Sequence, residues 1–301
     1  MKSHLLLSLA LVSLLPSLAL AQGTNVRPES TNISNRLTKT PRHQETVTIK
    51  QGDREISAFI VYPEVKEKAT AVILVHEIYG LTAWVKATAD QLAENGYIAI
   101  APDLLSGLGP NKGGTLDLPE TDVTGAVQKL DGAQVNADLN AVAAYVTKLP
   151  AANGNFAIAG FCWGGGTVFK FATQNKDVKA VFVFYGTPPP SADMAKITCP
   201  IYGFYGGSDA RVSATVPAAT EAMKAAGKTY EPVIFEGAGH GFMRTGQMDQ
   251  PATATDANKK AMTESWKKML DVLGKLSGKP APMVAAPTPA AATPAATTPK
   301  P

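Results

Sequence analysis

The sequence predicts an α/β domain in which a mostly parallel sheet carries helices on both faces and an antiparallel hairpin at one edge. Short apolar runs such as AVILV (71–75) and AVFVF (180–184) are typical of parallel strands that are covered on both sides. Segments with helical spacing alternate with these runs along the chain. Alternating strands and helices favour a parallel sheet between two helical layers.

The expected elements follow in order. Residues 45–50 and 55–62 alternate apolar and polar side chains around QGDR, which predicts the antiparallel hairpin. Further strands are expected at 71–76, 98–101, 156–159, 180–185, 201–205 and 230–235, and helices near 84–95, 134–148, 166–175, 214–226 and 256–276. In the second helix, Val135, Leu139 and Val142 recur at the spacing of an apolar stripe that faces a sheet.

Both ends of the 301-residue chain lie outside the predicted domain, which is expected to span residues 45–278. Residues 1–21 contain a basic residue, an apolar run and the ending Ala-Leu-Ala, which predict a secretory signal cleaved after Ala21 and a secreted or periplasmic protein. An uncleaved membrane anchor is the alternative. Residues 22–44 are polar and without periodicity, as in a leader, and residues 279–301 have the Pro, Ala and Thr composition of a disordered tail.

The charge pattern and the missing motifs exclude several function classes. The net charge is only +3, with both signs interspersed, so no nucleic-acid partner is expected. No G-x-G-x-x-G follows a strand and no phosphate-binding loop occurs, which argues against a nucleotide cofactor. H-E-x-x-H and C-x-x-C are also absent, so neither a metal nor another cofactor is predicted. We expect a monomer that acts on a small molecule and has no stable membrane span after signal cleavage.

The two cysteines are predicted to remain unpaired. Cys162 follows a predicted strand, whereas Cys199 precedes one. In a parallel sheet these positions lie at opposite edges, roughly 15 Å apart at about 3.3 Å per residue. A disulfide needs α-carbons within about 7 Å of each other. A free thiol in an oxidising compartment needs a functional explanation.

Cys162 lies where a strand changes into a helix. Gly160 and Gly164 flank it in the pattern G-x-C-x-G, which is the hydrolase elbow G-x-S-x-G with sulfur in place of oxygen. The helix N-terminus is expected to lower the thiol pKa. Asp209 and His240 follow later strands, in the order nucleophile, acid, histidine. Taken alone, Cys162 could be a core thiol, Asp209 a helix cap and His240 a loop histidine. Together they favour catalysis, in which the imidazole acts as the base and the carboxylate orients it.

Five ordered motifs resemble the dienelactone hydrolases (carboxymethylenebutenolidases). They are HEIYGL, PDL, GFCWGGG, YGGSDARV and GAGHGFMR, and the resemblance covers roughly residues 45–275. It implies an α/β-hydrolase fold and a triad of Cys162, Asp209 and His240. The implied activity is hydrolysis of lactones or small esters through a thioester acyl-enzyme.

The resemblance implies roles for three residues around the thiol. Glu77 would contact the thiol and take its proton when substrate binds, and a nearby carboxylate would keep the resting thiol protonated and less easily oxidised. The backbone N–H groups of Ile78 and Trp163 would form the oxyanion hole, which stabilises the charge that develops on the substrate oxygen.

Substrate-binding residues are less completely matched. Arg244 lies four positions after the histidine, where the family has an arginine that holds the substrate carboxylate. The alternative is that Arg244 is a solvated loop residue without a substrate contact. The second family arginine has no counterpart between residues 55 and 210, where Lys112 is the candidate replacement. Tyr79 and Trp163 are expected to line the acyl pocket, although core packing explains either equally well.

A non-catalytic cell-envelope binding protein on the same fold is the second hypothesis. The Pro/Ala/Thr tail motivates it, because such tails tether or space domains. The ordered triad favours the enzyme. Residues 104–122 are glycine-rich and without periodicity, and we expect them to form a loop that serves as a lid or pocket wall.

Overall fold

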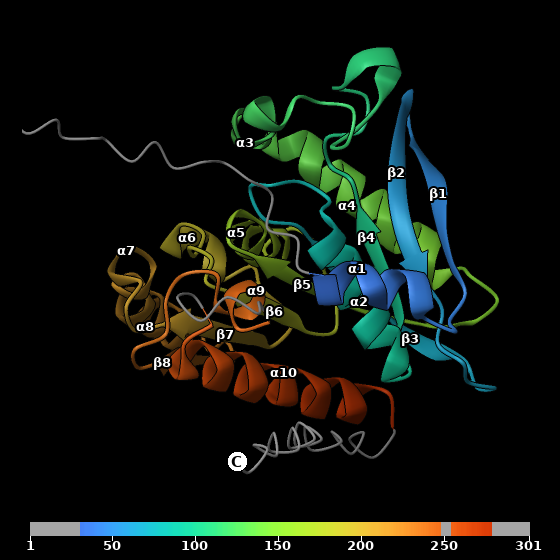
Figure 1. The fold of residues 1–301 in the computed structure, drawn as a ribbon. Helices are drawn as coiled ribbons and strands as arrows, with labels where there is room; N and C mark the ends of the chain where they lie inside the picture. The colour runs from blue at the N-terminus through green and yellow to red at the C-terminus, as the bar shows by residue number, and fades with distance from the viewer. Residues whose placement is uncertain (1–30, 248–253, 279–301) are drawn as a thin grey trace, which may run out of the picture.

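The computed structural model describes residues 31–247 and 254–278, which form a sheet with helices on both faces (Figure 1). The predicted signal, the first part of the leader and the predicted tail lie outside the described residues. Within them, one eight-stranded sheet has the order β1-β2-β4-β3-β5-β6-β7-β8.

The sheet is parallel except at one edge. The strands are β1 Gln44–Gln51, β2 Arg54–Val61, β3 Ala69–Val75, β4 Ile98–Pro102, β5 Ala152–Phe161, β6 Val181–Phe184, β7 Ile201–Gly206 and β8 Tyr230–Phe235. Strands β3 to β8 pair in parallel, whereas β1 pairs with β2, and β2 with β4, in antiparallel register. The predicted fold class and its edge hairpin are therefore confirmed.

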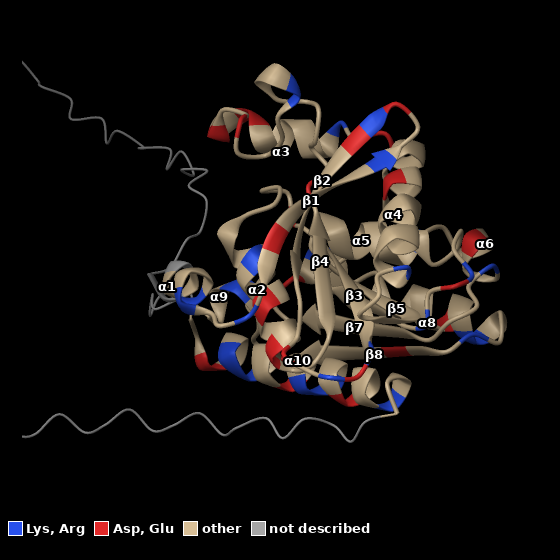
Figure 2. Ribbon diagram, turned by 90° about the vertical axis from the view of Figure 1, so that its right-hand side faces the viewer, with Lys and Arg blue, Asp and Glu red and all other residues tan. Residues whose placement is uncertain are grey.

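Helices cover both faces of the sheet (Figures 1 and 2). They are α1 Thr31–Lys39, α2 Ala83–Glu94, η1 Pro110–Lys112, α3 Glu120–Gln128, α4 Gly132–Thr147, α5 Trp163–Phe171, α6 Ser191–Met194, α7 Ala210–Ser213, α8 Val216–Ala225, α9 Phe242–Thr245 and α10 Asp256–Leu276. One apolar layer joins the sheet to α4, α5 and α8, and the other joins it to α1, α2 and α10. No helix in the described part of the chain combines the length and apolar composition needed to cross a membrane.

Strand β3 shows why the apolar runs are continuous. Ala71, Ile73 and Val75 pack into the layer with α4 and α5, whereas Val72 and Leu74 pack into the layer with α2 and α10. All five side chains are buried. A strand with helices on both faces has no solvent side, so the alternation of polar residues disappears.

Helix α1 lies within the segment expected to be a polar leader. Its Ile33 is buried against α2, and Leu37 packs against the same apolar layer and accepts a hydrogen bond from Gln44 Nε2 at 2.8 Å. Ion pairs add to these contacts. Arg36 Nε and Arg42 Nε lie 2.6 and 2.8 Å from opposite oxygens of Asp90, whose side chain is fully buried in α2. Ion pairs thus supply much of the contact between this segment and α2. For that reason, hydrophobic periodicity did not predict the helix.

The glycine-rich segment 104–122 is more ordered than a plain loop. It contains η1, and its last residues begin α3. Asp103, at the end of β4, accepts hydrogen bonds from the backbone N–H and hydroxyl of Thr115, both at 2.7 Å. Leu81 N donates to the same hydroxyl at 3.0 Å, so the segment is joined to the turn that follows β3. The sequence missed α3 because its apolar positions are few.

Candidate active site

The backbone at Cys162 forms a tight bend between β5 and α5. Its φ of +57° and ψ of −117° are strained for a residue with a side chain, and such strain typically costs about 1–3 kcal/mol. A Cβ at Gly160 would overlap the carbonyl oxygen of Gly164, and a Cβ at Gly164 would overlap that of His76. The two glycines of G-x-C-x-G therefore let strand and helix meet closely enough to expose the thiol at the bend.

His240 joins the thiol to a carboxylate. Its Nε2 lies 3.0 Å from Cys162 Sγ, and its Nδ1 lies 2.5 Å from Asp209 Oδ2. Because a carboxylate only accepts, Nδ1 carries the hydrogen and the Nε2 lone pair faces the thiol. Asp209 also caps α7 by accepting from Val212 N at 3.4 Å, so its helix-cap role and its contact with His240 coexist.

Cys162 is a protonated thiol at neutral pH. Burial and the charge of Glu77 raise its pKa to about 11, while the backbone N–H groups of Trp163 and Ile78 favour the thiolate. The expectation that the helix N-terminus lowers this pKa is therefore outweighed by burial. The two N–H groups that are expected to form the oxyanion hole, those of Ile78 and Trp163, both act on the sulfur.

Glu77 forms an ion pair with Arg244 rather than a hydrogen bond with the thiol. Arg244 Nε donates to Glu77 Oε2 at 2.8 Å, and the two side chains are only 15% and 5% exposed. Arg244 Cζ also lies 5.4 Å from the ring centroid of Tyr79, within cation–π range. Arg244 is thus a partly buried, paired residue and not a solvated loop residue.

Ile78 is held in a short turn after β3. Gly80 N donates to Glu77 O at 3.3 Å, and Gly80 has a φ of +69°, where a side chain would also overlap Thr115. This turn brings Glu77 and the backbone N–H of Ile78 to the same end of the sheet as Cys162. The motif HEIYGL therefore encodes both a carboxylate and a backbone donor.

Two features were missed or misplaced by sequence reasoning. Tyr185, just after β6, has a φ of +42° and places its ring 5.0 Å from that of His240. Its buried hydroxyl has no hydrogen bond of ordinary geometry among the described residues, and burial together with the Glu77 charge raises the pKa of Tyr185. The only sequence signal was its position at a strand end.

Lys112 lines a separate cavity near the β1–β2 turn, with Arg54 and Gln134, and does not join Arg244.

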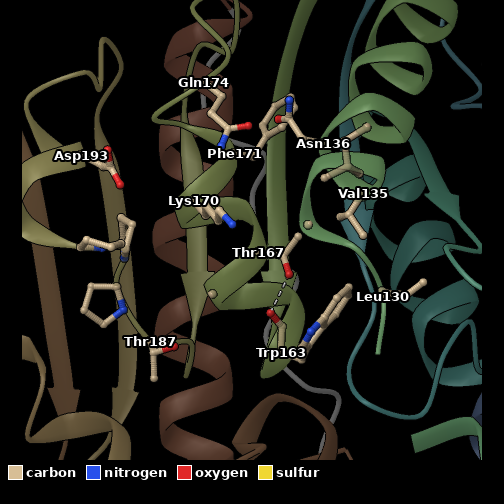
Figure 3. Close-up of a pocket in the computed structure, with 16 residues that line it drawn as sticks. Leu130, Val135, Asn136, Trp163, Thr167, Lys170, Phe171, Gln174, Thr187 and Asp193 are labelled. Carbon is tan, nitrogen blue, oxygen red and sulfur yellow. Dashed lines mark hydrogen bonds between the residues drawn. The ribbon is translucent and has the colours of Figure 1, made fainter. Parts of the chain in front are cut away.

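A cavity of about 510 Å³ opens beside Trp163, between α4, α5 and the loop after β6 (Figure 3). Thr167, Lys170 and Thr187 contribute polar groups to its wall, and Trp163 lies at one end. Trp163 lines this cavity, whereas Tyr79, Cys162 and His240 do not. The expected roles of Trp163 and Tyr79 in an acyl pocket therefore stay predictions.

Comparison with known proteins identifies the family of this chain. The sequence profile of the Dienelactone hydrolase family matches residues 56–277. A candidate carboxymethylenebutenolidase from Salmonella typhimurium is 32% identical over 242 residues, which cover 76% of this chain and 86% of that protein. One from Methylorubrum extorquens is 34% identical over 208 residues, which cover 65% and 71%. The crystal structure of a candidate dienelactone hydrolase from Klebsiella pneumoniae superposes with a TM-score of 0.68 at 26% identity, covering 78% of this chain and all of that one.

Proposed function

Because the chain belongs to the dienelactone hydrolase family, we propose that it is an exported hydrolase of lactones or small carboxylic esters that works through a thioester at Cys162. The observation that carries the proposal is the chain of contacts from Cys162 Sγ to His240 Nε2 at 3.0 Å and from His240 Nδ1 to Asp209 at 2.5 Å. A base that faces a thiol, and a carboxylate that fixes the base, form the arrangement that acyl transfer requires.

In the proposed acylation step, the Cys162 proton moves to His240 Nε2 while the sulfur attacks the carbonyl carbon. The carbonyl oxygen takes up negative charge and accepts hydrogen bonds from the N–H groups of Ile78 and Trp163. The tetrahedral intermediate then collapses, the C–O bond to the leaving oxygen breaks, and that oxygen takes the proton from His240. With a lactone, the leaving hydroxyl remains part of the same acyl group.

In the proposed deacylation step, His240 removes a proton from water, which attacks the thioester carbonyl. The C–S bond breaks, the sulfur recovers its proton and the carboxylic acid leaves. Asp209 stabilises the imidazolium in both steps because it is buried and faces Nδ1.

The ion pair of Glu77 and Arg244 supports a link between substrate binding and thiol activation. A substrate carboxylate that bonds to Arg244 would compete with Glu77 for the guanidinium. A released Glu77 would then be the alternative to His240 as acceptor of the thiol proton, and its negative charge already acts on Cys162. In the resting protein the raised thiol pKa keeps the sulfur protonated, which slows its oxidation in the oxidising compartment that we propose.

Turnover of a p-nitrophenyl acyl ester tests the function. We expect Cys162→Ala to lower the rate to that of the buffer, whereas the matched variant Cys199→Ala keeps the wild-type rate. Full activity in Cys162→Ala would exclude the cysteine mechanism. A wild-type protein that hydrolyses neither lactones nor short-chain esters would favour the non-catalytic binding protein instead.

Export is tested separately by the N-terminal residue of the protein recovered outside the cytoplasm. Cleavage after Ala21 makes that residue Gln22, which intact-mass measurement detects. A chain that retains Met1 in the membrane fraction would support the uncleaved anchor.

A further inference from the structure

His76 is a fully buried histidine at the end of β3 that the proposed chemical steps do not use. Its Nδ1 lies 2.7 Å from the carbonyl oxygen of Glu77. A carbonyl oxygen only accepts, so Nδ1 carries the hydrogen and Nε2 is the unprotonated nitrogen. Nε2 is buried and has no hydrogen-bond partner within the described residues.

The Glu77 carbonyl and the Ile78 N–H belong to one planar peptide group. A hydrogen bond that fixes the direction of the carbonyl therefore also fixes the direction of the N–H. It polarises the peptide as well, which makes the N–H a stronger donor. Gly80 N donates to the same oxygen at 3.3 Å, so the 2.7 Å bond from His76 is the shorter of the two.

The same imidazole also contacts the second predicted oxyanion residue. Its ring stacks on the indole of Trp163, with ring centroids 5.6 Å apart and planes 15° from parallel. Trp163 is the first residue of α5, directly after Cys162, so its side-chain packing affects the backbone that carries the donor. One side chain thus contacts Trp163 and the peptide group that carries the Ile78 N–H, and both of these N–H groups act on the sulfur.

Stability alone does not explain a histidine here. Burial lowers the pKa of His76 and keeps the ring neutral, and an unpartnered buried nitrogen opposes folding. An aromatic hydrocarbon side chain would stack on Trp163 without that penalty. What such a side chain could not supply is the N–H that bonds to Glu77 O.

We propose that His76 is a positioning residue for the oxyanion hole, holding the Glu77–Ile78 peptide by its Nδ1–H and Trp163 by ring stacking. The proposal rests on the hydrolase function proposed above. It assigns His76 no contact with substrate and no proton transfer.

Three variants separate the two contacts. His76→Phe keeps a stacking ring and loses the donor, whereas His76→Asn and His76→Leu are matched in size and differ in having or lacking a donor near the Nδ1 position. For p-nitrophenyl ester hydrolysis, we expect kcat to fall roughly 10- to 100-fold in His76→Phe and His76→Leu, with little change in KM. His76→Asn should remain within about threefold of wild type because the donor is retained.

Alkylation of Cys162 by iodoacetamide provides the second readout. This displacement releases iodide and forms no oxyanion, but it needs the thiolate, which the Ile78 N–H favours. A positioning role therefore predicts that alkylation slows in His76→Phe and His76→Leu by less than about threefold, well below the expected fall in kcat, and stays near wild type in His76→Asn. If His76→Phe and His76→Leu keep wild-type kcat, the proposal is wrong while the hydrolase function stands. If alkylation and turnover fall by the same factor, or if His76→Asn and His76→Leu behave alike, His76 has only a structural role. An inactive wild-type protein would overturn the function itself.

Discussion

Cys162 and Cys199 have the same bonding state and similar pKa values, but their surroundings differ. Both are unpaired, and burial raises the pKa of each to about 11. Cys199 lies just before β7 and is 7% exposed, within the apolar layer beneath α4, α5 and α8. Cys162 is only half-buried and faces His240, the charge of Glu77 and two backbone N–H groups.

A raised thiol pKa therefore does not identify a nucleophile in this protein. Burial alone produces it at Cys199, which lies among apolar side chains in the described part of the chain. At Cys162 the same energetic barrier to ionisation is combined with a base 3.0 Å away and donors for the developing charge.

Loss of the base should produce the largest effect. We expect His240→Ala to lower kcat/KM for a p-nitrophenyl ester by roughly 10³-fold, since general acid–base catalysis typically contributes 10²- to 10⁴-fold. Asp209→Asn should lower kcat/KM by a smaller factor, because the imidazole remains. Steady-state kinetics between pH 6 and 9 measures both.

Iodoacetamide labelling of Cys199 in denaturant provides the control, since its extent should match wild type in both variants. An unimpaired His240→Ala would mean that the contact with Cys162 is only packing. The two cysteines would then differ in exposure but not in chemistry.

Labelling of the native protein should distinguish the two thiols directly. Because both pKa values are raised to about 11, their thiolate fractions at pH 8 are similar, and the rates should differ through access. We expect Cys162 to be alkylated at least about tenfold faster than Cys199. Peptide mass spectrometry after short exposure measures the ratio. Equal rates would show that the core around Cys199 opens readily.

Much of this site could be predicted from the sequence because it is local or lies at strand ends. The elbow pattern places Cys162, and the order of the strands places Asp209 and His240 at the same edge of the sheet. The glycines that make the elbow possible also hid the beginning of α5, which starts at Trp163 and not near residue 166. Glycine lowers helix propensity, so the pattern indicated a later start.

The remaining features depend on tertiary contacts that no local pattern contains. The pairing of Glu77 with Arg244 joins residues 167 positions apart, and the ring of Tyr185, which follows β6, reaches His240, which follows β8. The stacking of His76 on Trp163 likewise joins two strand ends. Charge and ring contacts of this kind follow from how the chain folds, and hydrophobic periodicity does not report them.

Removing one charge should change only one of the two thiols. Glu77→Gln takes away a carboxylate that raises the pKa of Cys162, and it leaves the guanidinium of Arg244 without its counter-charge. We expect Cys162 alkylation at pH 8 to accelerate by roughly three- to tenfold, since one pKa unit changes the thiolate fraction about tenfold. Peptide mass spectrometry measures the rate.

Cys199 is the internal control for Glu77→Gln. Its pKa is raised by burial, with no contribution from Glu77, so its alkylation rate should stay the same. A parallel rise at both cysteines would indicate loosening of the fold rather than loss of a charge.

The smallest effect concerns stability at high pH. The pKa of Cys199 is about 11 in the folded chain and 9.0 for an unperturbed thiol, so between these values the unfolded chain has released a proton that the folded chain retains. The free energy of unfolding therefore falls as pH rises, by about 1 kcal/mol between pH 8 and 10 for this group.

The variant Cys199→Ala tests this effect. At pH 7 its free energy of unfolding should be about 1 kcal/mol lower than that of wild type, because the substitution leaves a small cavity. Above pH 8 its free energy of unfolding should fall less steeply, because the thiol is absent. Urea unfolding of wild type and Cys199→Ala at each pH measures both free energies of unfolding. Their difference isolates Cys199, because the other groups that titrate in this range are common to both proteins. Parallel curves would mean that Cys199 ionises equally easily in both states and that its burial does not oppose the thiolate.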